Sequence, residues 1–383
     1  MKSSITPSTA YSETRWEHME LNAVGRAAVY RSPNTPFVIR EYPLREPQME
    51  EVVVRVSMAT VCRSDIHSYQ GLRPNPCPGI LGHEIIGRII AMGDGVGHDL
   101  RGEPLAPGDR VTWTEYFFDG PCYHRDVLDM PQKCPGVRKY GHESADSPPH
   151  LLGGFADHCY ILPGTGILRL PEELEDAEAT PLNCGVATMV AVTERAGIGM
   201  GDTVVIQGLG LLGLYGSALA RSRGARLVIG IDPVQARREL AGRFGVDVAL
   251  DPAAEGESLG DFVKSLCGPD GADAVIEVAG NPEVVPAGFS MLRTGGCYIL
   301  AGLVNPGASV VVDANQILRR CLTVRGVHNY HPRHLVQALD FVVSNRERFP
   351  FSDLVDGRYS LENINEAFRD AAERRVLRAA VIP

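Results

Sequence analysis

The sequence predicts an α/β chain with two domains, one rich in short β-strands and one built on a doubly wound parallel sheet. Three observations support this prediction. The 383 residues exceed what one compact core usually holds. The first half carries short apolar runs broken by Gly and Pro, and the second half alternates apolar strands with helical stretches.

The β-rich domain is expected to begin at about residue 23 and to extend to residue 182. Residues 1–22 are polar and are expected to form an N-terminal arm or an extra helix. The strands expected in this domain are 52–56, 85–91 and 110–113, and the turns are 79–82 and 107–109.

Regular strand–helix alternation begins near residue 201. Such alternation indicates a parallel sheet covered on both faces, which we assign to residues 183–329. Residues 330–383 are expected to return to the β-rich domain through a final strand at 379–382. The expected strands of the parallel sheet are 203–207, 227–231, 274–278 and 297–301, and its helices are 212–223, 234–244 and 282–292.

Composition excludes several functional classes. The formal charge is 37 minus 47, or −10, which disfavours binding to nucleic acid or to anionic membranes. No apolar run approaches the roughly 20 residues needed to span a bilayer. The N-terminus lacks the basic start and apolar stretch of a signal peptide, so we expect a cytoplasmic protein. Nine cysteines, an odd number scattered along the chain, favour reduced thiols over a disulfide framework.

A glycine motif, Gly208-Leu209-Gly210-Leu211-Leu212-Gly213, follows the first parallel strand and opens a helix. Its three glycines permit a tight turn, close approach of backbone to a pyrophosphate, and packing of helix on strand. The N–H groups at the helix N-terminus then face the phosphate charge. The alternative is a glycine-rich turn in an unrelated α/β protein. Strand, glycines and helix in register favour a dinucleotide site.

Asp232 ends the second parallel strand, 19 residues after Gly213. A carboxylate at this place accepts hydrogen bonds from the adenosine ribose and repels the extra phosphate of NADP. We therefore expect NAD as the cofactor, with NADP less favoured. Arg237 is assigned to the same site, and with Arg238 it could soften the preference.

Cys62, His83 and Cys184 offer two thiolates and an imidazole, a ligand set that suits zinc. Three protein ligands leave a fourth position for water or substrate, as a catalytic zinc requires.

The motifs around these residues are Cys-x-Ser-Asp-x-His at 62–67, Gly-His-Glu at 82–84 and Asn-Cys-Gly at 183–185, all ahead of the glycine motif. In this order they resemble the zinc-dependent medium-chain dehydrogenase/reductase family, which includes the liver-type alcohol and sorbitol dehydrogenases. The resemblance extends from about Arg26 to the C-terminus. It implies a GroES-like catalytic domain, a Rossmann domain, an active site in the cleft between them, and a homodimer or homotetramer.

The resemblance also implies a reaction. Zinc lowers the pKa of a bound alcohol, and hydride passes from the alcohol carbon to the nicotinamide, or back to a carbonyl. The further residues that receive a role are Ser64 and His67 as a proton relay, Asp65 as the orienting partner of His83, Glu84 beside the metal, Thr188 near the nicotinamide and Arg378 at the pyrophosphate.

One family feature is altered. Most zinc members carry a second, structural zinc held by four cysteines, but only Cys122 and Cys134 stand in the matching stretch. Asp119 and Arg125 occupy the other positions, and arginine cannot bind zinc. We therefore expect the structural site to be lost. The alternative ligand set left open is Asp119, Cys122, His124 and Cys134.

The substrate is expected to be a polar alcohol: a polyol, a cyclitol, or an alcohol that bears a phosphonate or phosphate. Residues 131–134 and 139–143 resemble a bacterial branch, some of whose members are associated with phosphonate breakdown. His328 and Asn329 indicate a polar pocket. The residues considered for an anionic group are Arg138, Lys139, His142 and His150.

Two other functions stay open at this stage. A zinc-free enone or quinone reductase of the same superfamily needs the Rossmann domain but not the three metal ligands. A non-catalytic, crystallin-like cofactor-binding protein would not need Ser64 and His67.

Overall fold

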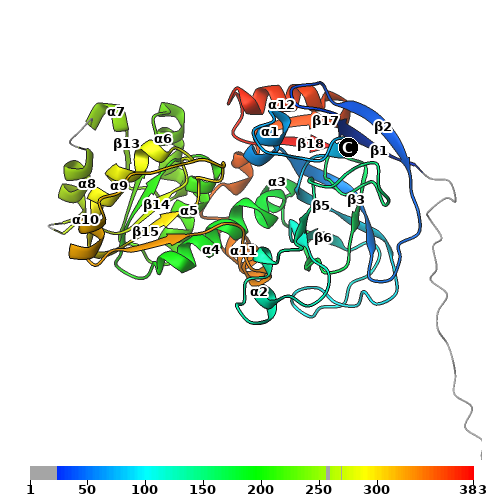
Figure 1. The fold of residues 1–383 in the computed structure, drawn as a ribbon, viewed down its shortest axis with the longest axis horizontal. Coiled ribbons are helices and arrows are strands. Elements are labelled where there is room, and N and C mark those ends of the chain that lie inside the picture. Colours follow the sequence, from blue (N-terminus) through cyan, green and yellow to red (C-terminus); the bar gives the residue numbers. More distant parts are fainter. Residues whose placement is uncertain (1–23, 256–258, 269) are drawn as a thin grey trace, which may run out of the picture.

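The computed structural model describes residues 24–255, 259–268 and 270–383. The arm expected at residues 1–22 lies outside the described residues. Two parts lie side by side: a parallel sheet with its helices on the left of Figure 1 and a β-rich part on the right. The predicted fold class, a β-rich domain joined to a doubly wound parallel sheet, is confirmed.

The β-rich part contains one large and two small sheets. Its central strand, β3, is apolar along most of its length and is buried almost throughout, because neighbouring segments cover both of its faces. The large sheet has the order β10 (Ile167–Arg169), β6 (Arg110–Trp113), β5 (Glu84–Met92), β3 (Val52–Thr60), β18 (Ala379–Ile382), β17 (Gly357–Ser360), with β9 (His158–Ile161) paired to β3. The small sheets are β2 (Val38–Pro43), β1 (Val24–Tyr30), β4 (Gly79–Ile80), and β7 (Tyr116–Phe117) with β8 (Arg138–Lys139).

The turn expected at residues 79–82 is only partly correct. Gly79 and Ile80 form the short strand β4, which pairs with the end of β1. Gly82 makes the turn, with φ of +89°. The sequence could not show this pairing, because β1 and β4 lie about 50 residues apart and meet only in the folded chain.

The second part is a six-stranded parallel sheet in the order β13-β12-β11-β14-β15-β16. The strand order reverses between β11 and β14, and ligands of such sheets bind in the crevice at the carboxyl ends of these strands. The strands are β11 (Thr203–Gln207), β12 (Leu227–Ile231), β13 (Val248–Leu250), β14 (Ala272–Glu277), β15 (Leu292–Leu300) and β16 (Thr323–Gly326). The helices of this part are α5 (Leu211–Ser222), α6 (Gln235–Ala241), α7 (Pro252–Glu255), α8 (Leu259–Cys267), α9 (Val285–Met291) and α10 (Ala314–Arg319).

Two helices connect the parts. Helix α4 (Gly185–Ala196) and helix α11 (Pro332–Asn345) pack together, and buried side chains such as Val190 and Leu339 place both in the core shared with the parallel sheet. Strands β17 and β18 then join the large sheet of the β-rich part. The boundaries drawn from the sequence, at 182 and 330, stay a prediction. The remaining helices are α1 (Arg63–Tyr69), α2 (Tyr123–Asp126), α3 (Asp176–Ala179) and α12 (Ile364–Ala372).

Among the residues that the structure describes, every helix is too short or too polar to cross a membrane.

Candidate metal centre and cofactor site

Four side chains from three segments meet between the two parts. Cys62 caps helix α1, His83 and Glu84 lie at the start of β5, and Cys184 precedes helix α4. One ligand atom of each residue lies within 4.8 Å of those of the other three. Cys184 Sγ is 3.5 Å from His83 Nε2. The three ligands expected from the sequence are thus brought together, and Glu84 joins them.

Asp65 fixes the segments that carry the metal ligands Cys62 and His83. Its buried carboxylate accepts hydrogen bonds from the backbone N–H of Cys62 at 2.8 Å and of Gly82 at 3.1 Å. Its Oδ1 lies 3.3 Å from His83 Nδ1. A proton on Nδ1 that faces Asp65 leaves Nε2 free to bind a metal. The orienting role expected for Asp65 therefore has a geometric basis.

Glu84 is fully buried, and burial raises its pKa to about 7 although the charge of Arg378 acts in the opposite direction. Its Oε2 lies 3.5 Å from Arg378 Nη1, which also donates to the carbonyl of Val61 at 2.9 Å. Its Oε1 is buried and accepts no hydrogen bond from any described residue. Arg378, expected at the pyrophosphate, thus lies against Glu84 while it also lines the cavity.

The donor set fits a catalytic zinc. A hydrogen bond shared with Cys184, together with the charge of Arg378, lowers the pKa of Cys62 well below its usual value, which favours a thiolate. Two sulfurs and one imidazole nitrogen match the ligands that zinc prefers. The unpaired oxygen of Glu84 supplies a carboxylate donor within reach of the same point.

Ser64 and His67 lie on helix α1, three residues apart, and both line the cavity. Ser64 Oγ is 3.4 Å from His83 Nε2. Burial and the nearby charge of Arg63 lower the pKa of His67, so its ring is neutral at pH 7 and can accept a proton. The residues expected to relay a proton therefore face the metal group and the cavity.

The metal group lies in a cavity of about 480 Å³. On the parallel-sheet side this cavity is lined by residues from α4, α5 and the ends of β14 and β15. Thr188 and Leu212 are among them, whereas Leu211 points into the core. The remaining wall consists mostly of polar and charged residues of the β-rich part and of the 327–329 segment.

Glu115 belongs to this wall and was missed by the sequence prediction. Its carboxylate is buried, with Oε2 3.8 Å from His83 Nε2 and Oε1 3.5 Å from Lys139 Nζ. Asn329 Nδ2 donates to the same Oε1. Although burial acts to raise it, Lys139 and His83 hold the pKa of Glu115 below its ordinary value. A single glutamate after strand β6 carries no motif, so only the fold reveals it.

The glycine turn has the geometry that its sequence requires. Gly208 directly follows β11 with φ of +102°, a conformation that favours glycine. A Cβ on Gly213 would lie 1.8 Å from the carbonyl oxygen of Gly208, so no side chain fits there. Gly210 is the N-cap of α5. These features bring the helix N-terminus close to the strand end, as a pyrophosphate site needs.

Asp232 lies at the end of β12, beside the glycine turn. Its buried carboxylate accepts hydrogen bonds from the backbone N–H of Leu209 and of Val234, both at 2.8 Å. Arg237 Nη1 lies 3.5 Å from the same carboxylate. The two charged residues expected at the dinucleotide site are therefore in contact with each other.

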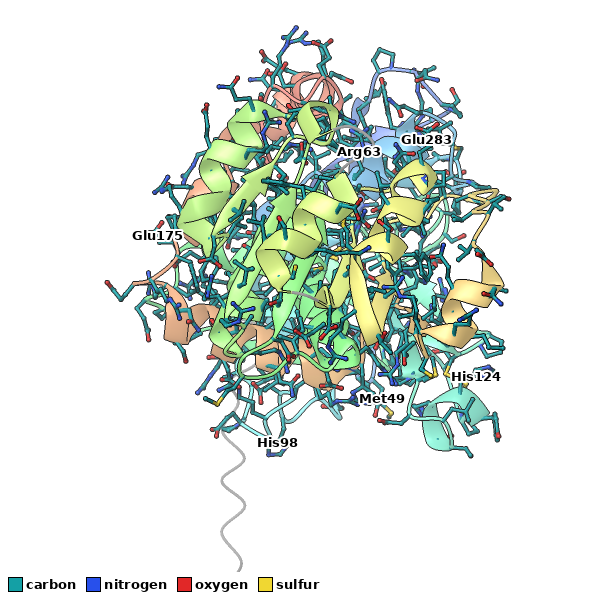
Figure 2. The ribbon with its side chains drawn as sticks, turned by 90° about the vertical axis from the view of Figure 1, so that its left-hand side faces the viewer. Met49, Arg63, His98, His124, Glu175 and Glu283 are labelled. Atoms are coloured by element: carbon teal, nitrogen blue, oxygen red, sulfur yellow. A yellow bond between two sulfur atoms is a disulfide. The ribbon has the colours of Figure 1, made fainter. Side chains whose placement is uncertain are left out.

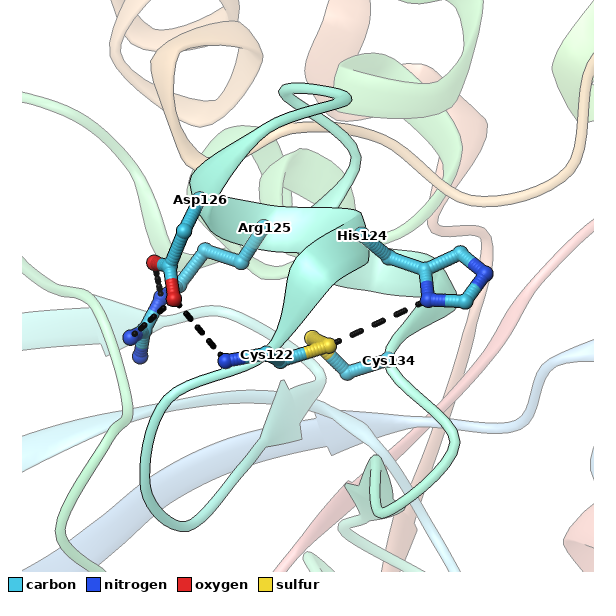
Figure 3. Close-up of a disulfide and its surroundings, with 5 residues drawn as sticks. All are labelled: Cys122, His124, Arg125, Asp126 and Cys134. Atoms are coloured by element: carbon cyan, nitrogen blue, oxygen red, sulfur yellow. Dashed lines mark hydrogen bonds and ion pairs between the residues drawn. A yellow bond between two sulfur atoms is a disulfide. The ribbon is translucent and has the colours of Figure 1, made fainter.

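The lobe expected to have lost its zinc contains a disulfide between Cys122 and Cys134, whose Cα atoms lie 6.1 Å apart (Figure 3). The expectation of reduced thiols is therefore wrong for this pair, while the other seven cysteines are free. Sequence spacing did not reveal the bond, because whether two cysteines 12 positions apart meet depends on the path of residues 123–133 between them. His124 Nδ1 is 4.0 Å from Cys122 Sγ, and Figure 2 shows His124 at the margin of the molecule.

Only part of the expected anion set reaches the cavity. Lys139 and His142 line it, as do His328 and Asn329. Arg138 instead pairs with Glu143 at 2.6 Å. His150 is also away from the cavity wall, because its ring stacks on Tyr42. Arg138 and His150, which were considered for an anionic group, therefore do not line the cavity.

Two family models match the chain. The alcohol dehydrogenase GroES-like domain matches residues 48–172, and the zinc-binding dehydrogenase domain matches residues 212–344. The chain belongs to the zinc-binding medium-chain alcohol dehydrogenase family. Its β-rich part is thus a GroES-like domain, and its six-stranded parallel sheet is Rossmann-like.

Curated relatives of this dehydrogenase act on different alcohols, as their names state. The 5-exo-hydroxycamphor dehydrogenase of Pseudomonas putida is 30% identical over 330 residues, which cover 85% of this chain and 90% of the relative. The sorbitol dehydrogenase of Halalkalibacterium halodurans is 28% identical, covering 91% and 96%. The L-threonine 3-dehydrogenase of Pyrococcus horikoshii is 30% identical, covering 76% and 79%.

Solved structures agree with the fold of this dehydrogenase. An alcohol dehydrogenase from Thermotoga maritima superposes with a TM-score of 0.89 at 30% identity, covering 94% of this chain and 100% of that one. A zinc-binding dehydrogenase from Sinorhizobium meliloti, solved with NADP bound, superposes with a TM-score of 0.82 at 26% identity, with the same coverage.

This protein is therefore a zinc-dependent alcohol dehydrogenase that uses a nicotinamide cofactor on a small alcohol or carbonyl substrate. Its catalytic zinc site consists of Cys62, His83, Glu84 and Cys184. The zinc-free reductase and the non-catalytic cofactor-binding protein are not supported by these findings.

Proposed function

We propose that this dehydrogenase oxidises a polar alcohol with NAD, or reduces the corresponding carbonyl with NADH. The substrate is a polyol, a cyclitol, or an alcohol that bears a phosphonate or phosphate. The observation that carries this proposal is the polar wall beside the metal group, formed by Glu115, Lys139, His142, His328 and Asn329. A long apolar alcohol would displace water from these polar groups without offering them hydrogen-bond partners, at a cost of about 1–3 kcal/mol for each polar atom left unpaired.

Each catalytic residue has a definite task in this proposal. When bound, zinc acts as a Lewis acid that lowers the pKa of the substrate hydroxyl. Asp65 keeps His83 Nε2 directed at the metal. Ser64 Oγ accepts the hydroxyl proton, and His67 receives it for release to solvent. Arg378 balances the charge of Glu84, so that this carboxylate is not left isolated in the protein interior.

The preference for NAD rests on Asp232. Its buried carboxylate lies where the adenosine ribose is expected, and its negative charge disfavours the phosphate of NADP. Arg237, 3.5 Å away, offsets part of that charge. Arg378 and Thr188 face the cavity from opposite domains, which supports their roles at the pyrophosphate and the nicotinamide.

We further propose that the chain holds one zinc, because Cys122 and Cys134 are joined in a disulfide and offer no thiolate in that form. This arrangement disfavours the alternative set of Asp119, Cys122, His124 and Cys134. Assembly into a homodimer or homotetramer, and a location in the cytoplasm, are predictions that follow from the family.

The test is NAD reduction by the zinc-loaded protein with a panel of polyols, cyclitols, hydroxyalkylphosphonates and long-chain alkanols. Polar alcohols should be turned over, and a chelator or Cys184→Ala should abolish the activity together with loss of zinc. Turnover of long-chain alkanols alone would contradict the proposed substrate class. Activity that survives loss of zinc would contradict the role of the metal group.

A further inference from the structure

The substrate wall of the cavity is cationic in a chain whose formal charge is −10. Arg73 and Lys139 line the cavity, and Lys133 lies directly behind it, with Nζ 2.6 Å from His328 Nδ1. Among the described residues that line the cavity, the carboxylates are Glu84 and Glu115, and the basic side chains are Arg63, Arg73, Lys139, Arg374 and Arg378. Five positive charges against two negative charges leave a local excess of three.

Arg73 follows helix α1 and is half-buried in the cavity wall. Its guanidinium forms no hydrogen bond or ion pair with any residue in 24–255, 259–268 or 270–383. Arg378, which lines the same cavity, differs because it pairs with Glu84. A partly desolvated guanidinium with five N–H donors and no acceptor is suited to bind an anionic oxygen group.

Lys139 carries the same charge as Arg73 and lines the same cavity. Its only ion pair in the described chain is with Glu115, at 3.5 Å, and Glu115 Oε1 also accepts from Asn329. Burial and the charges of Lys133, Lys139 and Arg73 together lower the pKa of His328 to about 4. Lys139 retains donors that can turn toward a ligand in the cavity that Arg73 also lines.

We propose that Arg73 and Lys139 form a subsite for an anionic oxygen group on the alcohol substrate: a carboxylate, a phosphate or a phosphonate. This inference rests on the proposed function and narrows its substrate class. The anion neutralises the excess positive charge of the wall, while the hydroxyl of the same molecule reaches the metal group. Glu115 acts as a positioning residue because it pairs with Lys139, and Asn329 supports it by donating to Glu115 Oε1.

The subsite is tested by calorimetric binding of methylphosphonate and of acetate to the full-length, zinc-loaded protein saturated with NADH, which covers the cofactor side of the cavity. We expect both Arg73→Gln and Lys139→Gln to raise the Kd of the anion that binds best by about tenfold. Arg138→Gln, on the same strand as Lys139 but paired with Glu143, should leave the Kd unchanged. Arg73→Lys should retain more affinity than Arg73→Gln.

Stronger binding of methylphosphonate supports a phosphonate or phosphate substrate, and stronger binding of acetate supports a carboxylate. Absence of binding to the wild-type protein, or a Kd that Arg73→Gln leaves unchanged, would overturn the subsite. NAD reduction by neutral polyols is measured in parallel. If polyols are oxidised but anions do not bind, the subsite alone fails. If anions bind but no alcohol is oxidised, the proposed function fails.

Discussion

Asp65 shows how much of this site depends on single side chains. One carboxylate accepts backbone hydrogen bonds from Cys62 and Gly82 and faces His83, so it connects two metal-ligand segments that are far apart in sequence. Glu115 plays a similar part on the substrate wall, where it holds Lys139 and Asn329. Both carboxylates are buried, and burial strengthens their hydrogen bonds and ion pairs because little water competes for them.

His67 provides a prediction about pH. Burial and Arg63 lower its pKa below 6.5, so the neutral ring that accepts a proton persists below that pH and is lost as the pH falls through the lowered value. His67→Gln should reduce kcat for alcohol oxidation at pH 7 by about tenfold or more. It should also abolish the fall in activity that protonation of His67 causes at low pH. The exposed His98, changed in the same way, is the control. A pH profile of kcat/KM that matches the wild type would contradict the relay.

Asp232 provides a prediction about the cofactor. Asp232→Gly removes a charged acceptor for the ribose hydroxyls and a repulsive charge near the NADP phosphate. We expect KM for NAD to rise by about tenfold, which corresponds to about 1.4 kcal/mol, while KM for NADP changes little or falls. Steady-state kinetics with both cofactors checks this, and NADP controls for damage to the turn. An equal rise for both cofactors would remove the basis for NAD preference.

Short helices and turns position the groups that bind the metal, relay the proton and hold the cofactor. Helix α1 has only seven residues, yet it carries Ser64, Asp65 and His67 and begins at the ligand Cys62. Because Cys62 is its N-cap, the helix start fixes the thiol and the proton-accepting groups together. The glycine turn works in the same way on the cofactor side, where the end of β11 and the start of α5 are joined in a few residues.

The fit of helix α5 against β11 predicts a large effect at Gly213. Gly213→Val would place its side chain against the carbonyl of Gly208, and we expect a loss of about 1–3 kcal/mol of unfolding free energy together with loss of NAD binding. Thermal unfolding and cofactor titration measure the two effects. The same substitution at Gly199, where an added Cβ meets nothing within 4 Å, should change neither. Normal stability and NAD affinity in Gly213→Val would contradict the tight turn.

The disulfide lobe predicts both a thiol count and a metal count. Seven thiols should react in the unfolded, unreduced protein and nine after reduction, because Cys122 and Cys134 are paired. Metal analysis should find one zinc per chain in the wild type and in Cys122→Ser. Two zinc ions per wild-type chain, with nine reactive thiols before reduction, would show that the chain keeps the structural zinc site.

At the scale of the whole molecule, the active site depends on contact between the two parts. Tyr330 connects them: its hydroxyl contacts the backbone of Asn183 and of Glu115, and its carbonyl accepts from Tyr116. Asn183 in turn donates to the carbonyl of His83 at 2.9 Å. The segment that leaves the parallel sheet is thus hydrogen-bonded to the residues around the metal group.

The outer strand of the parallel sheet leads to a prediction about assembly. Strand β16 ends the sheet among the described residues, and Val324 on it is 40% exposed. An exposed sheet edge favours pairing with a second copy. Light scattering should give a mass of two or four chains, and Val324→Lys should shift it toward one chain. A wild-type protein that is monomeric at assay concentrations would contradict this expectation.

Local patterns in the sequence determined the fold class, the zinc ligands Cys62, His83 and Cys184, and the glycine turn. Strand alternation and the glycine turn depend on spacing within short segments, and the ligands were found from the order of three short motifs along the chain. The tertiary structure alone decided that Arg73, Glu115 and Lys139 share one cavity, and that Cys122 is bonded to Cys134. The cavity depends on long-range packing of separate loops, and the disulfide depends on the path of the short stretch between its two cysteines; no local pattern encodes either.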